Sequence, residues 1–327
     1  MPTLLHLRAA AARTPLRRPL VWLRNLGLSS ADVFLASYPR SGNTMLRFLL
    51  AETITECNST FDNIQRAIPD VGVHVGAKAF LSGQGRLIKT HERYRPSYQR
   101  AIYIVRDVRD VLLSNYGRET SLDIIPLRSL DRYVLLFMQG KMTLWHSWQR
   151  HVTEWLDSPL SRRGDLHLVR FEEMRADLVG TLCKAMEFLG LSWNLETIER
   201  AIANNSLEKM RVKEDSAARL ARSPEEHGRW VGQGKVFGWR NKLTPEQLVV
   251  VDKYAKDLLL RLGYETGEAY LAKRESDQPS HQNHQIASLL PVPPRPQDTS
   301  RTAAGEWKPL LRSIGGRVAR RCSWYRH

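Results

Sequence analysis

The chain has 327 residues, of which 42% are hydrophobic and 25% charged, a balance that is typical of a globular protein and excludes a wholly disordered chain. Its formal net charge of +15 lies partly at the ends, because residues 1–31 contain five Arg and no acid, and residues 275–327 contain eight Lys or Arg against four acids. This charge suits an anionic ligand. The sequence contains no recognised nucleic-acid-binding module, so we expect no specific nucleic-acid partner.

The three cysteines, Cys57, Cys183 and Cys322, are widely spaced and form no metal-ligand pattern. This argues against a disulfide framework and a zinc site, and it favours a reducing, cytoplasmic compartment. No apolar run approaches the roughly 18 to 20 residues that cross a bilayer, so we expect no transmembrane segment. The acid-free segment Met1–Arg24 indicates a basic arm, with an organelle signal or a surface-binding helix as the alternatives.

Short apolar runs alternate with segments of helical periodicity along the chain. Strands are expected at residues 32–37, 86–90, 101–105 and 166–170. Helices are expected at residues 45–55, 107–116, 130–156, 178–189, 195–204 and 245–262. This alternation predicts a parallel sheet covered by helices on both faces.

Composition divides the chain into three parts. Residues 1–31 form the basic arm, and residues 32–273 contain all the expected strands and helices of a single domain. Residues 274–327 are rich in Ser, Gln, Asn and Pro, a composition that predicts a disordered basic tail.

The segment Tyr38-Pro-Arg-Ser-Gly-Asn-Thr44, here called the phosphate loop, joins the first strand to the first helix. Backbone N–H groups and the positive end of the helix dipole favour an anion at such a junction. Gly42 lets the backbone approach a ligand closely, and Arg40 adds a permanent charge. Further hydrogen-bond donors are Ser41, Asn43 and Thr44. The Walker pattern GxxxxGK[ST] is absent, and an ordinary strand-to-helix turn is the alternative.

A second candidate anion site follows the strand 101–105. Arg106 comes directly after this strand, and Ser114 lies eight residues later, about two helical turns along. A guanidinium and a hydroxyl from a neighbouring helix can together bind a phosphate. The alternative is a solvated helix that carries Arg109 and Asp110 as surface charges.

The strand 86–90 ends in a candidate catalytic pair. Lys89 and His91 are two residues apart and therefore project from the same side of the strand. A neutral imidazole can accept a proton from an acceptor hydroxyl, and an ammonium can stabilise negative charge on a leaving oxygen. An ordinary core or surface role for His91 is the alternative.

Together these segments resemble motifs of the sulfotransferases that use 3′-phosphoadenosine 5′-phosphosulfate (PAPS). The phosphate loop resembles the family's 5′-phosphosulfate loop, YPRSGNTxxR, which Arg47 completes. Residues 106–116 resemble the 3′-phosphate motif RxPRDxxxSxY, with Val108 in place of its Pro. The resemblance implies that Arg40 contacts the group between phosphate and sulfate, that residues 41–44 hold the 5′-phosphate, and that Arg106 and Ser114 hold the 3′-phosphate.

Three further segments carry the resemblance. The Lys-Thr-His triplet that ends at His91 resembles the family's catalytic triplet, which implies that His91 is the general base, assisted by Lys89 and Arg40. Phe171 after the fourth strand resembles an aromatic residue near the adenine, with core packing as the alternative. Residues 232–240 resemble the loop RKGxxGDWK that covers the 3′-phosphate, and they keep Trp239 and Arg240. They depart from that pattern at Gly232, Phe237 and Gly238, with Arg229 or Lys235 as replacement charges.

The resemblance implies an α/β, P-loop-like three-layer fold with a central parallel sheet flanked by helices. It implies in-line transfer of a sulfuryl group from PAPS, without a metal, to the hydroxyl or amine of an acceptor. We expect a small-molecule, lipid or glycan acceptor, with a peptide as the alternative. Aromatic and Met side chains of the predicted helix 130–156 border the acceptor cleft or belong to the core. The alternatives are a P-loop nucleotide phosphotransferase or kinase, which the absent Walker lysine disfavours, and a non-catalytic nucleotide-binding relative.

Overall fold

The computed structural model describes residues 22–121, 129–217 and 231–277. Within them one parallel sheet has the strand order β2-β1-β3-β4. Its strands are β1 (Val33–Ser37), β2 (Leu87–Thr90), β3 (Arg100–Val105) and β4 (Leu166–Arg170). Each begins and ends within one residue of the range predicted from its apolar run, so the predicted parallel sheet is confirmed.

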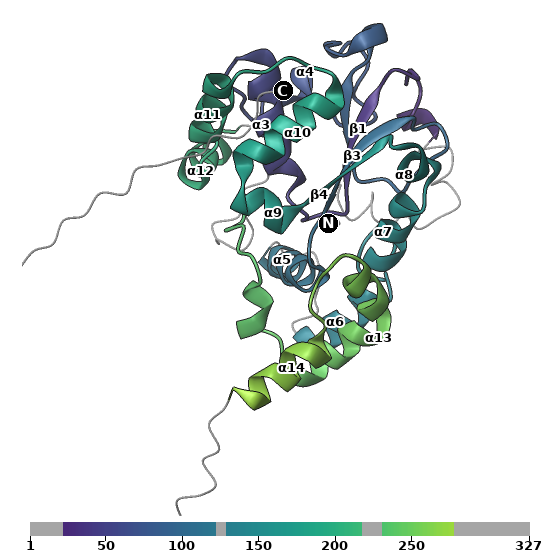
Figure 1. Cartoon of the computed structure of the whole chain (residues 1–327), viewed down its shortest axis with the longest axis vertical. Coiled ribbons are helices and arrows are strands. Elements are labelled where there is room, and N and C mark those ends of the chain that lie inside the picture. The colour runs from purple at the N-terminus through teal and green to yellow at the C-terminus, as the bar shows by residue number, and fades with distance from the viewer. Residues whose placement is uncertain (1–21, 122–128, 218–230, 278–327) are drawn as a thin grey trace, which may run out of the picture. The chain divides into compact units, whose positions relative to one another are not determined.

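The sheet is covered by helices on both faces because successive side chains of each strand point in opposite directions. In β1, Val33 and Leu35 belong to one apolar cluster, and Phe34 and Ala36 belong to the other. The first cluster includes side chains of α3 (Asn43–Thr55), α10 (Leu178–Leu189) and α11 (Leu195–Asn204), and the second those of α7 (Trp148–Leu156) and α13 (Pro245–Arg261). Figure 1 shows these two groups on opposite sides of the strands, and the predicted three-layer α/β fold is confirmed.

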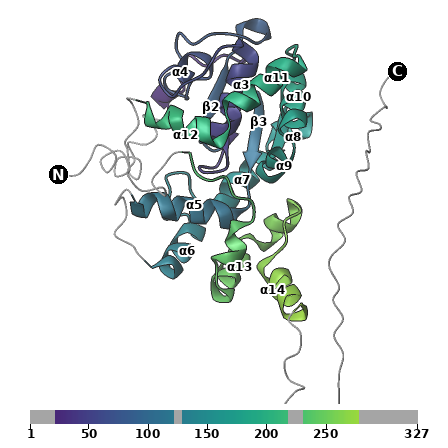
Figure 2. The same ribbon diagram turned by 90° about the vertical axis from the view of Figure 1, so that its left-hand side faces the viewer.

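The other elements are short or lie beyond the sheet. They are α4 (Ile64–Ala67), η1 (Ser82–Gln84), α5 (Val108–Ser121), α6 (Leu130–Met138), α8 (Pro159–Arg163), α9 (Phe171–Ala176), α12 (Leu207–Asp215), η3 (Gly238–Asn241) and α14 (Gly267–Ser276). Helix α13 packs against α6 and α14, and α5 packs against α6 and η3. Figure 2 shows α5, α6, α13 and α14 gathered below the sheet.

The prediction of one long helix over residues 130–156 is wrong. Helix α6 ends at Met138, and α7 begins at Trp148 after the cap residue Ser147. Between them Gly140 has φ +74°, and a Cβ on it would overlap the backbone nitrogen of Ser147. The left-handed glycine ends the first helix and the serine hydroxyl begins the second, so the break follows from local chemistry.

The predicted arm and tail fall largely on residues that the structure does not describe, namely 1–21 and 278–327. The described end of the arm contacts the domain, because Arg24 donates to the carbonyl of Val71 at 3.0 Å and lies 3.6 Å from Glu92. Helix α14 continues to Ser276, three residues beyond the predicted end of the domain. Cys57 and Cys183 are free thiols. No helix in the described part of the chain is long and apolar enough to span a membrane.

A buried ion pair fixes the start of α5. Arg109 Nε and Nη2 donate to the two carboxylate oxygens of Asp107 at 2.9 and 2.7 Å, and the guanidinium lies 3.6 Å above the Trp239 ring. Arg109 and Asp107 are fully buried, and Asp110 is 5% exposed. The alternative in which Arg109 and Asp110 are surface charges is therefore wrong.

Replacing Arg109 with Ala should lower the free energy of unfolding by about 3 to 5 kcal/mol, because the Asp107 carboxylate would remain buried without its partner. Denaturation in urea measures this loss. The matched control is Arg163→Ala, which breaks the exposed Arg163–Asp165 pair and should cost at most about 1 kcal/mol. Equal losses in the two variants would contradict the role given to the buried pair.

Candidate active site

The phosphate loop makes a tight turn at the start of α3. Arg40 has φ +69° and Gly42 has φ +97°, two left-handed positions that fold the chain back between β1 and the helix. Gly42 is the N-cap of α3 and has no side chain that could accept from the first N–H groups of the helix. The buried Ser41 hydroxyl also lacks a hydrogen-bond partner among the described residues. Unsatisfied donors at a helix N-terminus form a site for an anion.

Phe171 packs directly on this loop. A Cβ placed on Gly42 would lie within 2.7 Å of Phe171 Cε2, so only glycine fits here. The Arg106 guanidinium lies 4.3 Å from the centre of the Phe171 ring, and the ring is 2% exposed. The first residue of α9 therefore holds the phosphate loop against β4.

The structure brings together the two predicted anion motifs. Arg40 Nε donates to Ser114 Oγ at 2.9 Å, and Arg106 Nη1 donates to the carbonyl of Arg40 at 3.1 Å. Burial, and then the charges of Arg118 and Arg106, lower the pKa of Arg40 to about 10. Three guanidinium groups so close together repel one another, and a bound anion relieves this repulsion.

Arg106 also holds the C-terminal loop, residues 231–237, over the site. Its Nη2 donates to the carbonyl of Lys235 at 2.8 Å, which leaves Nε without a partner among the described residues. At the other end of the loop, the Val231 N–H donates to Glu214 of α12 at 3.0 Å. The C-terminal loop, which was expected to cover the nucleotide, therefore contacts Arg106 beside the phosphate loop. Arg229 lies outside the described residues.

Trp239 and Arg240 are not brought to the phosphate loop. Trp239 is fully buried, with Arg109 above its ring and Tyr270 packed edge-on at 4.8 Å. Arg240 pairs with Glu265 at 2.9 Å. Within the described residues no hydrogen bond or ion pair joins either side chain to the phosphate loop.

His91 is attached to the root of the phosphate loop in a defined tautomer. Its Nδ1 lies 2.9 Å from the backbone carbonyl of Ser37, which can only accept, so Nδ1 carries the proton and Nε2 the lone pair. The amide of Asn43 donates to the Ser37 hydroxyl at 3.1 Å and to the Leu35 carbonyl, so this side chain supports the loop from behind. Burial, and then the charge of Lys89, lower the pKa of His91 to about 3, so the imidazole is neutral at physiological pH.

Lys89 is paired with a carboxylate that sequence patterns gave no reason to single out. Its Nζ lies 2.6 Å from Asp70, which also lies 3.3 Å from Arg47. Burial opposes ionisation of the Asp70 carboxyl, but the nearby Lys89 and Arg47 outweigh it and hold its pKa well below the usual range. Arg47, expected one turn into the helix, also donates to the carbonyl of Ile68 at 2.7 Å.

A second buried imidazole supports His91 from behind. His151 Nε2 donates to the backbone carbonyl of His91 at 3.1 Å, and the Tyr103 hydroxyl lies 2.9 Å from His151 Nδ1. Burial lowers the pKa of His151 to about 4, which keeps it neutral. The half-buried Trp145 ring lies 6.4 Å from the His91 imidazole, so one aromatic residue of the predicted helix 130–156 does reach the candidate site. Most of the other aromatic and Met side chains of this range, namely Phe137, Met138, Trp148 and Trp155, are fully buried in the core.

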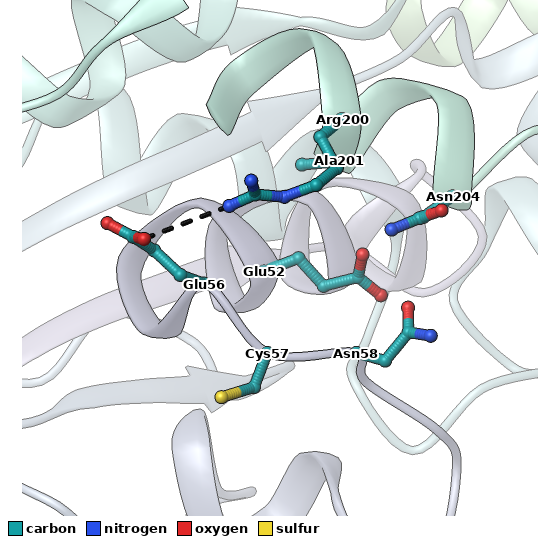
Figure 3. Close-up of a pocket in the computed structure, with 7 residues that line it drawn as sticks. All are labelled: Glu52, Glu56, Cys57, Asn58, Arg200, Ala201 and Asn204. Carbon is teal, nitrogen blue, oxygen red and sulfur yellow. Dashed lines mark ion pairs between the residues drawn. The ribbon is translucent and has the colours of Figure 1, made fainter. Parts of the chain in front are cut away.

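A surface hollow of about 250 Å³ lies at the other end of α3. Figure 3 shows Glu52, Glu56 and Arg200 among its lining side chains, with Arg200 3.8 Å from Glu56. Helix α3 has 13 residues and is therefore about 20 Å long, which separates the hollow from the phosphate loop. None of the predicted site residues lines it.

A parallel sheet between two layers of helices, with a glycine-containing loop between the first strand and the first helix, is typical of the P-loop-like class of α/β proteins. Within that class, the sequence matches the sulfotransferase domain over residues 30–263. The chain therefore belongs to the sulfotransferase domain family and is a sulfotransferase. This excludes the alternative of a P-loop phosphotransferase.

Individual relatives agree with this assignment. Mouse sulfotransferase 2A2 is 27% identical over 237 residues, which cover 68% of this chain and 82% of the relative. Human sulfotransferase 2A1 is 25% identical, and the match covers 71% of this chain and 85% of the relative. A mouse sulfotransferase complexed with PAP, which is adenosine 3′,5′-bisphosphate, has a similar fold, with a TM-score of 0.55 and 21% sequence identity. The match covers 79% of this chain and 93% of the mouse protein. A retinol dehydratase in complex with androsterone and PAP also has a similar fold, with a TM-score of 0.59 and 22% sequence identity. The match covers 74% of this chain and 85% of the retinol dehydratase.

Replacing Gly42 with Ala should distort the phosphate loop, because the new Cβ would overlap the Phe171 ring in addition to requiring a left-handed backbone. We expect a loss of stability of about 2 to 5 kcal/mol, measured by thermal and urea denaturation. Gly164→Ala is the matched control, since Gly164 has φ +78° and open space around it, and it should lose only about 1 to 2 kcal/mol. Similar losses at both positions would show that the contact with Phe171 is unimportant.

Proposed function

We propose that the domain of residues 32–273 transfers the sulfuryl group of PAPS to an acceptor hydroxyl or amine by in-line displacement, with His91 as the general base. The observation that carries this proposal is the neutral imidazole, whose proton is directed to the Ser37 carbonyl and whose Nε2 lone pair is available. Hydrogen bonds through Ser37 and Asn43 connect this base to the phosphate loop.

The anion-binding residues fit a nucleotide with two phosphorylated ends. We assign the 5′-phosphosulfate to the start of α3, where Arg40, the unpaired Ser41 hydroxyl and the N–H groups of Gly42, Asn43 and Thr44 lie. We assign the 3′-phosphate to Ser114 and the free Nε of Arg106. The PAP found in complexes of the structural relatives supports the same co-substrate for this chain. Phe171 lies between these groups and is proposed to border the adenine.

Trp239 and Arg240 were predicted to contact the co-substrate, and we now propose an indirect role. The Trp239 N–H donates to Asp110 at 3.0 Å, and Asp110 lies 3.9 Å from Arg106. Trp239 therefore anchors the end of the C-terminal loop, which Arg106 holds at Lys235. The Arg240 guanidinium lies 4.8 Å from the ring of Phe237 in the same loop, so both residues support the nucleotide site through this loop.

In the proposed reaction the acceptor hydroxyl gives its proton to His91 Nε2 as its oxygen bonds to sulfur. The bond between sulfur and the bridging oxygen breaks on the opposite side, and the electron pair stays on the phosphate of PAP. The positive charges of Arg40 and Lys89 stabilise the negative charge that develops on this phosphate. Because the transition state of such a transfer is loose, position and electrostatics supply most of the rate acceleration.

Two observations favour an acceptor hydroxyl on an apolar molecule among the small-molecule, lipid and glycan classes. The Trp145 ring lies 6.4 Å from the imidazole that we propose as the base, and aromatic rings bind apolar and cyclic groups well. The retinol dehydratase relatives bind androsterone or retinol, both apolar alcohols.

The protein should bind adenosine 3′,5′-bisphosphate (PAP) more tightly than AMP, because AMP leaves the Arg106 and Ser114 position empty. Arg106→Ala should weaken PAP binding by about 10-fold to a few hundred-fold, as expected for a charge-assisted contact of about 1.5 to 3 kcal/mol. Isothermal calorimetry measures both differences, with circular dichroism as the folding check and Arg163→Ala as the control. Equal affinities for PAP and AMP would remove the 3′-phosphate assignment.

Replacing His91 with Ala should lower turnover by about 10² to 10⁴-fold and leave PAP affinity within about threefold, because this residue acts on the acceptor proton. Isotope-labelled PAPS and an acceptor mixture analysed by mass spectrometry provide the assay. His167→Ala on β4, at the opposite edge of the sheet from β2, is the control. Near-normal turnover of folded His91→Ala at saturating substrates would place the base elsewhere.

A further inference from the structure

We propose that Asp70 is a positioning residue for the reaction: it fixes the Lys89 ammonium beside His91 and keeps it charged. This inference depends on the proposed function, in which Lys89 opposes the charge on the leaving phosphate. Asp70 belongs to no motif of the sequence and lies outside the phosphate loop. It is the carboxylate that pairs with Lys89 in the structure.

The backbone fixes Asp70 beside Lys89. The N–H of Lys89 donates to the Pro69 carbonyl at 2.7 Å, and the N–H of Val71 donates to the Lys89 carbonyl at 2.9 Å. Asp70 thus forms a parallel bridge with Lys89 along the outer edge of β2. The two side chains start from adjacent positions on neighbouring chain segments, and their contact does not rely on a flexible loop.

Both oxygens of the Asp70 carboxylate are occupied. Oδ1 accepts from Lys89 Nζ at 2.6 Å, and Oδ2 accepts from Gln65 Nε2 at 2.6 Å and from Arg47 at 3.3 Å. Gln65 belongs to α4 and Arg47 to α3, and Gln65 also accepts from the Asp70 N–H at 2.8 Å. Because two helices fix the carboxylate, it can hold the ammonium in one place.

Asp70 is also the acid that stabilises the charged form of Lys89 against its burial and the nearby guanidinium groups. The Lys89 side chain is 13% exposed, and the charged groups that act on it are Asp70, Arg47 and Arg24, with the neutral His91 beside it. Burial lowers the pKa of Lys89, and both guanidinium groups lower it further, whereas Asp70 raises it. Without the carboxylate, the ammonium would lose its proton at a lower pH and could no longer stabilise negative charge.

The first test measures Lys89 directly and needs no acceptor. The full-length apo protein is labelled with acetic anhydride between pH 7 and 11, and mass spectrometry follows acetylation of the peptide that contains Lys89. In Asp70→Asn the midpoint of Lys89 reactivity should fall by at least about one pH unit, equivalent to about tenfold higher reactivity below the midpoint. Asp70→Glu should restore most of the shift.

The matched control is Glu52→Gln. Glu52 pairs with Lys213 at 2.7 Å, and the Lys213 side chain is also 13% exposed. This variant removes a buried carboxylate from a lysine that is remote from the site, so it should leave the Lys89 midpoint unchanged. An unchanged Lys89 midpoint in folded Asp70→Asn overturns the proposal.

The second test measures turnover with isotope-labelled PAPS across pH 6 to 10. In Asp70→Asn the activity should fall off at a pH lower by at least about one unit, with PAP affinity little changed, and Asp70→Glu should recover it. A purely structural role would lower the melting temperature without changing the pH at which the activity falls off, and that result overturns the inference. Absence of turnover in the wild-type protein would instead refute the proposed function, and the labelling test would still decide whether Asp70 keeps Lys89 charged.

Discussion

The buried guanidinium of Arg106 connects the parts of the site that come from distant points in the sequence. It donates to the carbonyls of Arg40 and Lys235 and lies over the ring of Phe171. The phosphate loop, the junction of β4 and α9, and the C-terminal loop therefore meet at one side chain. Arg106 can do this because it follows β3 at the carboxyl edge of the sheet, where the loops after parallel strands converge.

Burial has opposite consequences for the two kinds of ionisable group in this site. For His91 it favours the neutral form, which is the form that a general base needs. For Arg40 and Arg106 it disfavours the charge, and the neighbouring guanidinium adds to this at Arg40, so the pair is best stabilised by an anion. The same burial thus suits both the base that we propose at His91 and the anion site that we propose at Arg40 and Arg106. Burial also disfavours the charge of the Lys89 ammonium, and we propose that its ion pair with Asp70 keeps it protonated.

Features set by local chemistry were predictable from the sequence. The strands and the phosphate loop depend on short apolar runs and on Pro and Gly, and they lie where expected. The break before α7 was missed, although Gly140 and Ser147 signal it. The contacts of Asp70 with Lys89 and of His151 with His91 join residues 19 and 60 positions apart, and no local pattern reveals them. Trp239 was placed at the nucleotide by its motif, but the partners that bury it, Arg109 and Tyr270, are known only from the folded chain.

A crystal structure of the protein with bound PAP tests the central claim most directly, because it locates both phosphates relative to Arg106. The account predicts the 5′-phosphate at the N-terminus of α3 within hydrogen-bond distance of the Ser41 hydroxyl. It also predicts the 3′-phosphate beside Ser114 and Arg106, and His91 Nε2 open toward the position of the transferred group. A nucleotide bound elsewhere, or one whose 3′-phosphate contacts neither Arg106 nor Ser114, would contradict it.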